Sequence, residues 1–263
     1  MKNTTKIYTL VASFALLIMS CSHTNTNLSD DLQSMDESTL FSNEILDGYI
    51  RINASNIALN NIDRFHIDMF FLDPSNKKTL HAGKVSLGNL NFEPNKNSDY
   101  PSPFYPSKSD NFETYWGKPL DIKIEGNIAN GFEPAKATYK MPELIKITIP
   151  HNAFASRSAA TIVKWNPGSE KNEKVYLRIE YPHPPFGNKE NVDIMKGKDQ
   201  VWSKLVPDNG EFSISPEIIK KFPAKGTLTI KVARFEADEI KSGTKRIGVY
   251  FYTLASSSLT IAE

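Results

Sequence analysis

Apolar and polar residues alternate with a period of two along much of the chain after residue 43. Phe65, Ile67 and Met69, for example, are separated by single polar residues. Such alternation places the apolar side chains on one face of a half-buried β-strand. The same pattern returns at residues 122–124, 145–149, 175–181, 212–214 and 228–232. Many short strands of this kind predict a sandwich or a barrel.

Turn residues separate these predicted strands. Asp, Asn, Pro, Ser and Gly gather at residues 73–76, 166–169 and 208–210, where Gly or Asn can adopt positive φ. Short strands joined by such turns favour antiparallel pairing over βαβ units. One short helix is predicted at residues 215–222, because Ser215 suits the N-cap and Pro216 suits the first helical position.

We therefore predict an all-β fold with two tandem antiparallel β-sandwich domains of the immunoglobulin-like type. A fresh strand pattern begins near Pro142, so the predicted N-terminal sandwich covers residues 44–141 and the C-terminal sandwich covers residues 142–263. Each has about a hundred residues, a common size for such domains. A single larger sandwich that continues across Pro142 is the alternative.

The first twenty residues have the order of a secretory signal peptide. Lysines precede an apolar run at residues 7–19, and the small residue Ser20 stands directly before Cys21, the one cysteine of the sequence. The run is shorter than the roughly 20 residues that a transmembrane helix needs. Residues 21–43 are rich in Ser, Thr, Asn and Asp, which predicts a flexible tether.

Residues 17–21, with the sequence LIMSC, resemble the lipobox of bacterial lipoproteins. The resemblance implies cleavage before Cys21 and lipidation of that cysteine, and several acyl chains make a durable membrane anchor. Ser22 stands where an Asp would be an inner-membrane retention signal, so the expected location is the outer membrane, on its periplasmic or its surface face. The alternative is an ordinary cleaved signal with a cysteine near the cut.

The rest of the chain resembles a class of exported Bacteroidetes lipoproteins that have a lipobox, a tether and two β-domains. The stretches that carry the resemblance are residues 70–74, 81–88, 208–212, 222–226 and 246–254. They are patterns of turns and strands. The resemblance therefore implies location and fold, and the class carries no assigned reaction.

Charge is balanced along the chain. The sequence has 31 basic and 30 acidic residues, and removal of residues 1–20 would take away two lysines, which leaves 29 basic against 30 acidic. Lysines are interspersed with Asp and Glu, whereas nucleic-acid binding draws on clustered Lys and Arg. No nucleic-acid partner is predicted.

No catalytic or metal-binding signature is evident. The five histidines are far apart in the sequence and belong to no metal-binding spacing: His23, His66, His81, His151 and His183. The S-x-x-K pattern occurs at residues 75–78 and 242–245, but both lie in predicted turns without the companion motifs of serine acylases. We predict no enzymatic activity, no cofactor and no metal.

Four aromatic residues are the candidates for ligand binding. They lie in a stretch that is stiffened by three prolines: Tyr100, Tyr105, Tyr115 and Trp116. Rigid aromatic rings on such a loop could form a platform on which sugar rings stack. The alternative is that these rings pack into a core or cover its edge, which is the commoner role of aromatic residues.

Two further pairs of large side chains are assigned structural roles. Trp165 and Trp202 are flanked by apolar strand positions, which predicts that they belong to the core. Arg178 and Arg234 are placed on the outward register of their strands, where exposure or cross-strand pairing is expected.

The sequence thus predicts an outer-membrane, lipid-anchored protein that acts as a non-catalytic binder or scaffold. Its partners would be the membrane, through Cys21, and a glycan or an envelope protein. A pilin-like or adhesin structural subunit is the second hypothesis. A hydrolase of polysaccharides or of the envelope is the third hypothesis, because the sequence has none of the motifs that such an enzyme would need.

Overall fold

Strand pairing organises the part of the chain that the structure describes. A computed structural model describes residues 46–57, 62–76, 78–97, 99–107, 110–148, 154–170, 173–181 and 201–262. These residues form one sheet of eight strands, one of four and one of two. The predicted all-β fold is confirmed.

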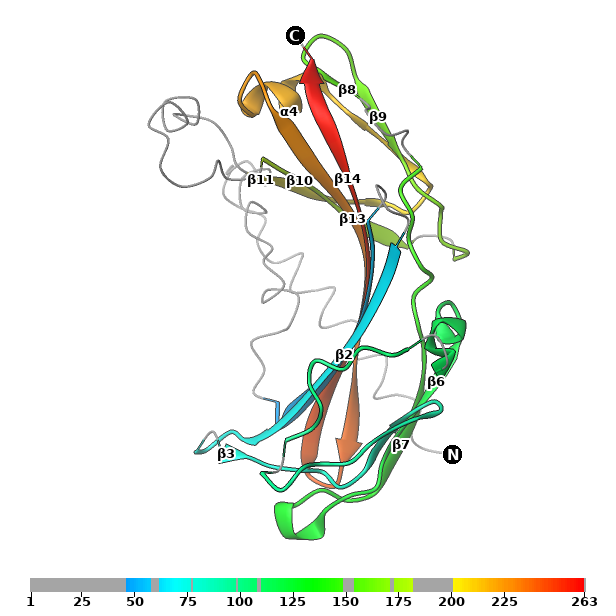
Figure 1. Ribbon diagram of the computed structural model, residues 1–263, viewed down its shortest axis with the longest axis vertical. Coiled ribbons are helices and arrows are strands. Elements are labelled where there is room, and N and C mark those ends of the chain that lie inside the picture. The colour runs from blue at the N-terminus through cyan, green and yellow to red at the C-terminus, as the bar shows by residue number, and fades with distance from the viewer. Residues whose placement is uncertain are drawn as a thin grey trace, which may run out of the picture. The chain divides into compact units, whose positions relative to one another are not determined.

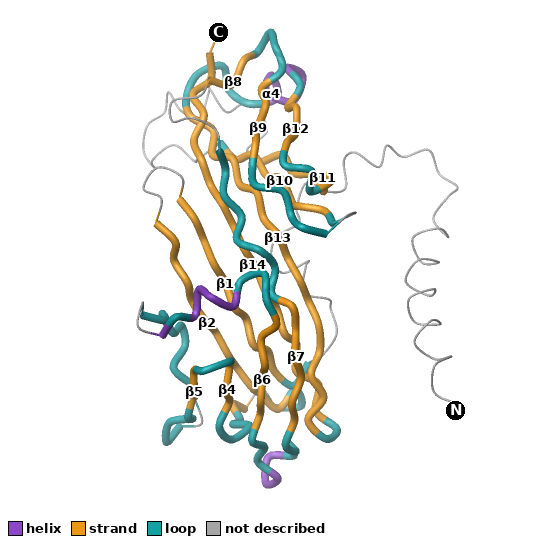
Figure 2. The backbone as a smooth tube through the Cα atoms, turned by 90° about the vertical axis from the view of Figure 1, so that its right-hand side faces the viewer, coloured by secondary structure: helices purple, strands orange, loops and turns teal. Residues whose placement is uncertain are grey.

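The eight-stranded sheet has the order β11-β10-β13-β14-β1-β2-β3, and β8 pairs with the end of β14 (Figure 1). Its strands are β1 (Gly48–Ile57), β2 (Ile62–Asp73), β3 (Lys78–Thr79), β8 (Phe154–Ser156), β10 (Lys174–Glu180), β11 (Val201–Pro207), β13 (Thr227–Ser242) and β14 (Lys245–Ala262). The four-stranded sheet has the order β5-β4-β6-β7 and the two-stranded sheet pairs β12 with β9 (Figure 2). Their strands are β4 (Val85–Leu87), β5 (Leu90–Phe92), β6 (Pro119–Ile124), β7 (Ala135–Lys140), β9 (Thr161–Lys164) and β12 (Glu211–Ile214).

Helices in the described residues are short. The α-helix α4 (Pro216–Lys221) has Pro at its start, as predicted, but the Ser215 side chain makes no capping hydrogen bond. The 3-10 helices are η2 (Phe112–Tyr115) and η3 (Ile128–Asn130).

The longest pairing is the hairpin of β13 and β14, in which residues 227–242 pair antiparallel with residues 245–260. Gly243, at φ 64°, occupies the first position of the two-residue turn. Positive φ at that position matches the twist of the strands, which explains a glycine there. Figure 1 shows the two strands side by side, orange and red, from the end near α4 to the end near β7.

One face of this hairpin serves two hydrophobic cores. Ile247, Val249 and Phe251 pack into the first core, with β1, β2 and the four-stranded sheet. Further along the same face of β14, Ala255 and Leu259 pack into the second core, with β9, β10, β12 and α4. The odd-numbered positions of β14 therefore face inward through both cores.

The period-two patterns mark inward faces, as predicted. The apolar positions that alternate in β2, β6, β10, β12 and β13 are buried or packed against a core. The pattern at 145–149 differs: Ile145 and Ile147 are buried, but the pairing there is an isolated bridge between Ile147 and Trp165. At residues 145–149 the alternation therefore predicts correctly which side chains are buried, but it does not predict the backbone pairing.

The prediction of two tandem immunoglobulin-like domains is not confirmed. β1, which precedes Pro142, pairs in parallel with β14, which follows it. Strands from both sides of Pro142 thus share one sheet, and β13 and β14 contribute to both cores. The boundary between residues 44–141 and 142–263 stays a prediction.

Several predictions lie outside the described residues. They are the signal peptide at residues 1–20, Cys21 with the tether at residues 21–43, and His23, His151 and His183. Within the described residues, no helix is long and apolar enough to cross a membrane.

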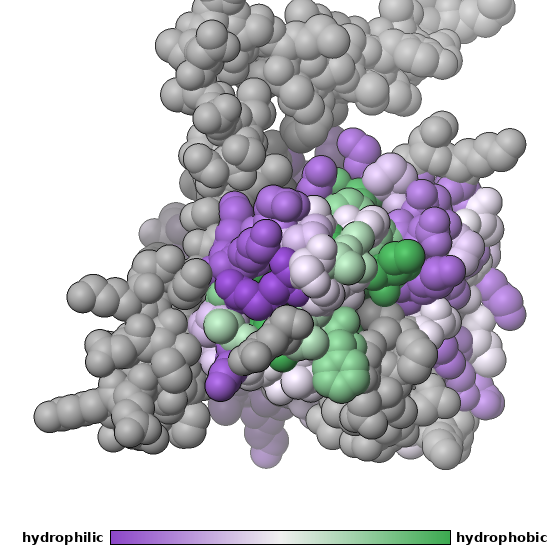
Figure 3. Space-filling view, turned by 90° about the horizontal axis from the view of Figure 1, so that it is seen from above, coloured by the Kyte–Doolittle hydropathy of each residue, from purple (hydrophilic) through white to green (hydrophobic). Residues whose placement is uncertain are grey.

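Large apolar side chains are also found on the surface. Those exposed among the described residues are Tyr105, Ile128, Phe154, Ile162 and Leu205. In the view from above, hydrophobic residues are scattered between hydrophilic ones wherever the described surface is visible (Figure 3). Single exposed apolar residues are common on protein surfaces, so exposure alone assigns no function to any of them.

Candidate functional site

A buried arginine lies where the two cores meet. Arg234 is on β13 and only 4% of its side chain is exposed. Its Nε donates to Asp208 Oδ2 at 2.6 Å and its Nη2 to Asp208 Oδ1 at 3.2 Å. The Asp208 side chain is 1% exposed, so this ion pair is almost completely desolvated.

The remaining guanidinium hydrogens bind backbone carbonyls. Nη2 donates to Asn166 O at 2.6 Å, and Nη1 donates to Glu143 O at 3.1 Å and Leu144 O at 3.3 Å. A buried ion pair is tolerated only when such hydrogen bonds satisfy it. Arg234 thereby fixes residues 143–144, the segment through which the chain passes from the first core to the second.

Asp208 ties a third element to the arginine. It accepts a hydrogen bond from Trp165 Nε1 at 2.7 Å, and its backbone N–H donates to Glu173 O at 2.9 Å. Gly168 passes close by, because a Cβ there would lie 2.7 Å from both Asp208 Oδ2 and Glu173 Oε2. The network therefore holds the loop that carries Glu173 in place.

The predicted outward position of Arg234 is wrong. Its number has the same parity as Leu228, Ile230 and Val232, which face the second core, so the strand directs it inward. Arg178 lies on the outward face of β10, as predicted, and its ion pair at 2.5 Å is with Glu180 of the same strand instead of a residue across the sheet. Trp165 is buried, as predicted, and Trp202 is half-buried against the second core.

A pocket of about 440 Å³ opens beside this network, and we name it the acidic pocket. It is bounded by the end of β7, the segment at residues 141–143, residues 169–170, residues 173–174 at the start of β10, and residues 234–238 of β13. Five carboxylates line it, against two lysines besides the neutralised Arg234. The carboxylates are those of Glu143, Glu170, Glu173, Glu236 and Asp238.

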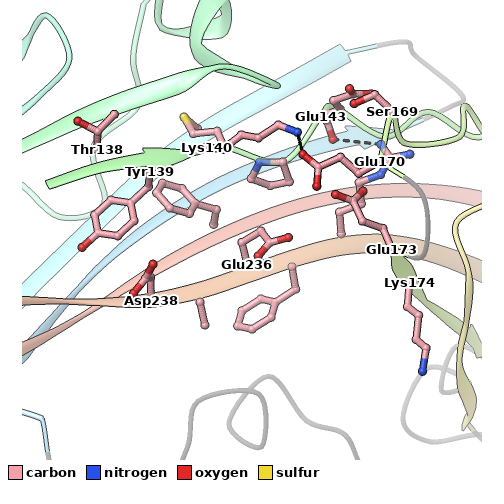
Figure 4. Close-up of a pocket in the computed structure, with 16 residues that line it drawn as sticks. Thr138, Tyr139, Lys140, Glu143, Ser169, Glu170, Glu173, Lys174, Glu236 and Asp238 are labelled. Atoms are coloured by element: carbon pink, nitrogen blue, oxygen red, sulfur yellow. Dashed lines mark hydrogen bonds and ion pairs between the residues drawn. The ribbon is translucent and has the colours of Figure 1, made fainter. Parts of the chain in front are cut away.

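The two lysines differ in where they point. Lys140 reaches Glu170 and forms an ion pair with it, whereas the Lys174 side chain extends away from the carboxylates (Figure 4). The hydrogen bond from Lys140 holds the pKa of Glu170 below its ordinary value and raises that of Lys140. Glu173, Glu236 and Asp238 are left with an excess of negative charge.

The excess of negative charge contributes to raised pKa values at two glutamates. Partial burial raises the pKa of the solvent-accessible Glu236 above its ordinary value, and repulsion from Glu173 and Glu170 raises it further. Burial, followed by repulsion from Glu170, also raises the pKa of Glu173. Carboxylates gathered at a cost to their own ionisation are typical of functional sites.

Tyr139 forms the wall at the β7 side of the pocket. Its hydroxyl donates to Glu239 O at 3.0 Å. Burial raises its pKa to about 12, with a further contribution from Asp238 and Glu239. The phenol thus remains a neutral hydrogen-bond donor and joins β7 to β13.

Carboxylates and lysines, without any histidine, supply the ionisable groups of the acidic pocket besides Arg234 and Tyr139. No cluster of His, Cys, Asp and Glu in the described ranges is arranged to hold a metal ion. Neither His66 nor His81 lines the pocket. What the arrangement can do is hold a positively charged group.

The four predicted aromatic candidates do not share a surface. Tyr100 is buried, and its hydroxyl accepts from Ala82 N and donates to Gly83 O. Burial raises its pKa to about 12. Trp116 is also buried and stacks on Phe65.

The other two candidates are more accessible. Tyr115, at the end of η2, is half-buried and packs against Phe112. Tyr105 is 64% exposed and lies beside the ring of His66. Of the four, Tyr105 is the ring that an external ligand could reach.

The serines of the two S-x-x-K patterns have structural partners. Ser75 donates to Asp73 Oδ1 at 2.6 Å within its turn. Ser242 is fully buried and its hydroxyl donates to Glu133 O. Both hydroxyls belong to turns, as predicted.

Comparison with known proteins gives no family for this chain. No protein-family model matches it, and no curated protein sequence matches it.

Proposed function

We propose that this protein is a non-catalytic binding protein, lipid-anchored at the outer membrane through Cys21, whose acidic pocket holds a cationic group of its partner. The lipobox-like residues 17–21 support the anchor. The observation that carries the binding role is the pocket itself, in which Glu173 and Glu236 have raised pKa values.

A bound cation would remove the cost that these carboxylates carry. A positive charge within about 4–6 Å favours the ionised form of a carboxyl group. Binding would therefore lower the pKa of Glu236 and Glu173, and the relief of their repulsion would add to affinity. A neutral or anionic ligand would gain nothing from this arrangement.

Oligolysine is a direct probe of the pocket. We expect the full-length protein in detergent to bind tetralysine and not tetraglutamate, as measured by calorimetry at low salt. The double variant Glu173→Gln/Glu236→Gln should bind about tenfold more weakly, since two charge pairs are lost. Binding should also weaken as salt is raised, because screening acts on exposed charges.

The matched control is Glu113→Gln, which removes one carboxylate from the exposed surface of η2. It should leave tetralysine binding unchanged. If the control and the double variant bind equally, the acidic pocket is not the site and this function fails.

The anchor needs its own test. Intact-mass analysis of protein purified from its native membrane should show residues 1–20 removed and Cys21 acylated. An unmodified Cys21, or a retained signal peptide, would refute the anchor without bearing on the pocket.

At the level of the fold, we propose that each core is an immunoglobulin-like sandwich and that the two sandwiches share β13 and β14. Sharing would make them unfold together. A single transition in urea, seen alike by fluorescence and circular dichroism, is expected. Two separate transitions would favour independent tandem domains.

The structural-subunit hypothesis ranks second. Among the described residues, the ladder between β10 and β13 ends at the pair Tyr176–Ala233, so β13 continues as a sheet edge toward Ala237. An edge of this kind can accept a strand of another subunit. However, Glu236 and Asp238 lie on this edge, and charges there oppose such pairing. Crosslinked ladders in native membranes would reverse the ranking.

A further inference from the structure

A second surface, separate from the acidic pocket, lies on the outward face of β1 and β2. Three cross-strand pairs follow one another there: Tyr49 with Phe70, Arg51 with Asp68, and Asn53 with His66. These residues alternate with Ile50, Ile52, Ile67 and Met69, which face the first core. We name the three pairs, together with Ser102 and Tyr105 of the adjoining loop, the β1–β2 strip.

The loop is fixed firmly against β2. Phe104 and Ile67 exchange two backbone hydrogen bonds of 2.8 Å each. The Phe104 ring points the other way and meets Phe92 edge-on at 5.1 Å. The next residue, Tyr105, therefore presents its exposed ring from a rigid support.

The ring of Tyr105 borders the polar pairs. Its centroid lies 6.1 Å from that of His66. His66 Nε2 lies 2.7 Å from Asn53 Nδ2 and 3.5 Å from Asp68 Oδ2. Ser102 Oγ makes a long contact of 3.4 Å with Asp68 Oδ1.

The central ion pair is neutral overall. Arg51 donates from Nε at 3.1 Å and from Nη2 at 2.9 Å, both to Asp68 Oδ2. The strip therefore offers planar hydrogen-bonding groups without the charge excess that marks the acidic pocket.

Cross-strand pairs often serve stability alone, but two groups of this strip are accessible to a ligand. The side chains of Arg51 and His66 are 31% and 33% exposed. Asn53 is only 7% exposed, and its amide holds the His66 ring through the 2.7 Å contact with Nε2. A ligand hydroxyl can therefore reach the guanidinium and the imidazole beside the ring of Tyr105.

Aromatic rings stand at both ends of the strip. Tyr49 and Phe70 lie 6.1 Å apart at one end, and Tyr105 lies at the other. From Phe70 to His66 is four residues, which is about 14 Å along a strand. A hollow of about 330 Å³ adjoins the first end and is lined by Tyr49, Phe70 and Ser102.

We propose that the β1–β2 strip binds a neutral oligosaccharide. Sugar rings have apolar C–H faces that can stack on the exposed ring of Tyr105 and contact the half-buried Phe70. Their hydroxyls donate and accept, which matches the accessible imidazole and guanidinium groups between the rings. The strip is longer than one sugar unit, so the ligand is an oligosaccharide. Because the strip carries no excess charge, the sugars it favours are uncharged.

The test uses the full-length protein in detergent and a panel of immobilised neutral hexasaccharides of the cello, malto, manno and xylo series. We expect retention on at least one of them. Tyr105→Ala should weaken it about tenfold, since one stacking ring is lost. Tyr105→Phe keeps the ring and should retain binding.

Phe154→Ala is the matched control, because Phe154 is an equally exposed aromatic residue, at 63%, on β8. It should bind as the unaltered protein does. The proposal is overturned if no hexasaccharide is retained, or if Tyr105→Ala and Phe154→Ala behave alike. The strip shares no residue with the acidic pocket, so neither outcome decides the function proposed for the pocket.

Discussion

Arg234 and Glu236 are two residues apart on β13, but their charges are compensated to very different extents. Arg234 is almost completely buried, and every one of its donor nitrogens has an acceptor. Two residues further, Glu236 lines the acidic pocket with Glu173, and no cation neutralises either of them fully. The charge and the hydrogen-bond donors of Arg234 are satisfied within the protein, as a buried structural ion pair requires. The negative charge of Glu173 and Glu236 is not, so a bound cation could compensate it.

The largest expected effect comes from breaking the buried ion pair of Arg234. Arg234→Met would leave Asp208 buried without its counter-ion, and we expect the free energy of unfolding to fall by about 3–5 kcal/mol. Urea denaturation of the full-length protein measures this. Lys136→Met is the control, since its pair with Asp121 is exposed and should be worth less than about 1 kcal/mol. Equal losses would abolish the distinction between Arg234 and Glu236.

A smaller effect is expected at the other partner of Asp208. Trp165→Phe keeps an aromatic ring but removes the Nε1 hydrogen bond, which should lower the free energy of unfolding by about 1–3 kcal/mol. Trp202→Phe is the comparison, because Trp202 is half-buried and its ring packs on Phe212. A greater loss at Trp202 than at Trp165 would contradict the central role of Asp208.

The smallest effect has the opposite sign. Because the pKa of Glu236 is raised in the folded state, its ionisation begins to cost stability as the pH rises above the ordinary pKa of a glutamate, and the full cost is reached above the raised value. Glu236→Gln should therefore stabilise the protein at pH 7, by less than about 1 kcal/mol given the solvent exposure of the side chain.

The gain should disappear as the pH falls below the ordinary range of a glutamate, where the carboxyl is protonated in both the folded and the unfolded state. Unfolding curves at pH 7 and at about pH 3 test this. Glu113→Gln should show no such dependence. A destabilised Glu236→Gln variant at pH 7 would mean that the carboxylate is structurally useful.

The alternation of residues predicted the strands well because burial of one face imposes a period of two. It also contained the inward position of Arg234, whose parity matches Leu228 and Ile230. The outward position predicted for Arg234 followed the usual exposure of arginine instead of the inward register of the strand. An arginine on an inward register is thus a signal for a buried polar network.

Other features could not be predicted from local patterns. The parallel pairing of β1 with β14 joins residues almost two hundred positions apart, and no turn between them specifies it. The acidic pocket gathers Glu173 and Glu236 from separate strands and loops for the same reason. Of the aromatic candidates, Tyr100 and Tyr105 are both tyrosines next to prolines, and only the direction of the loop decides which is buried.

The position of β1 has a mechanical consequence. This strand follows the N-terminal segment that contains Cys21, and over its ten residues it is bonded to β14 on one side and to β2 on the other. A pull from a membrane anchor would act along the strand, so the hydrogen bonds on both sides would share the load instead of opening one after another. Such a protein could stay folded under a pulling force between the membrane and its bound partner.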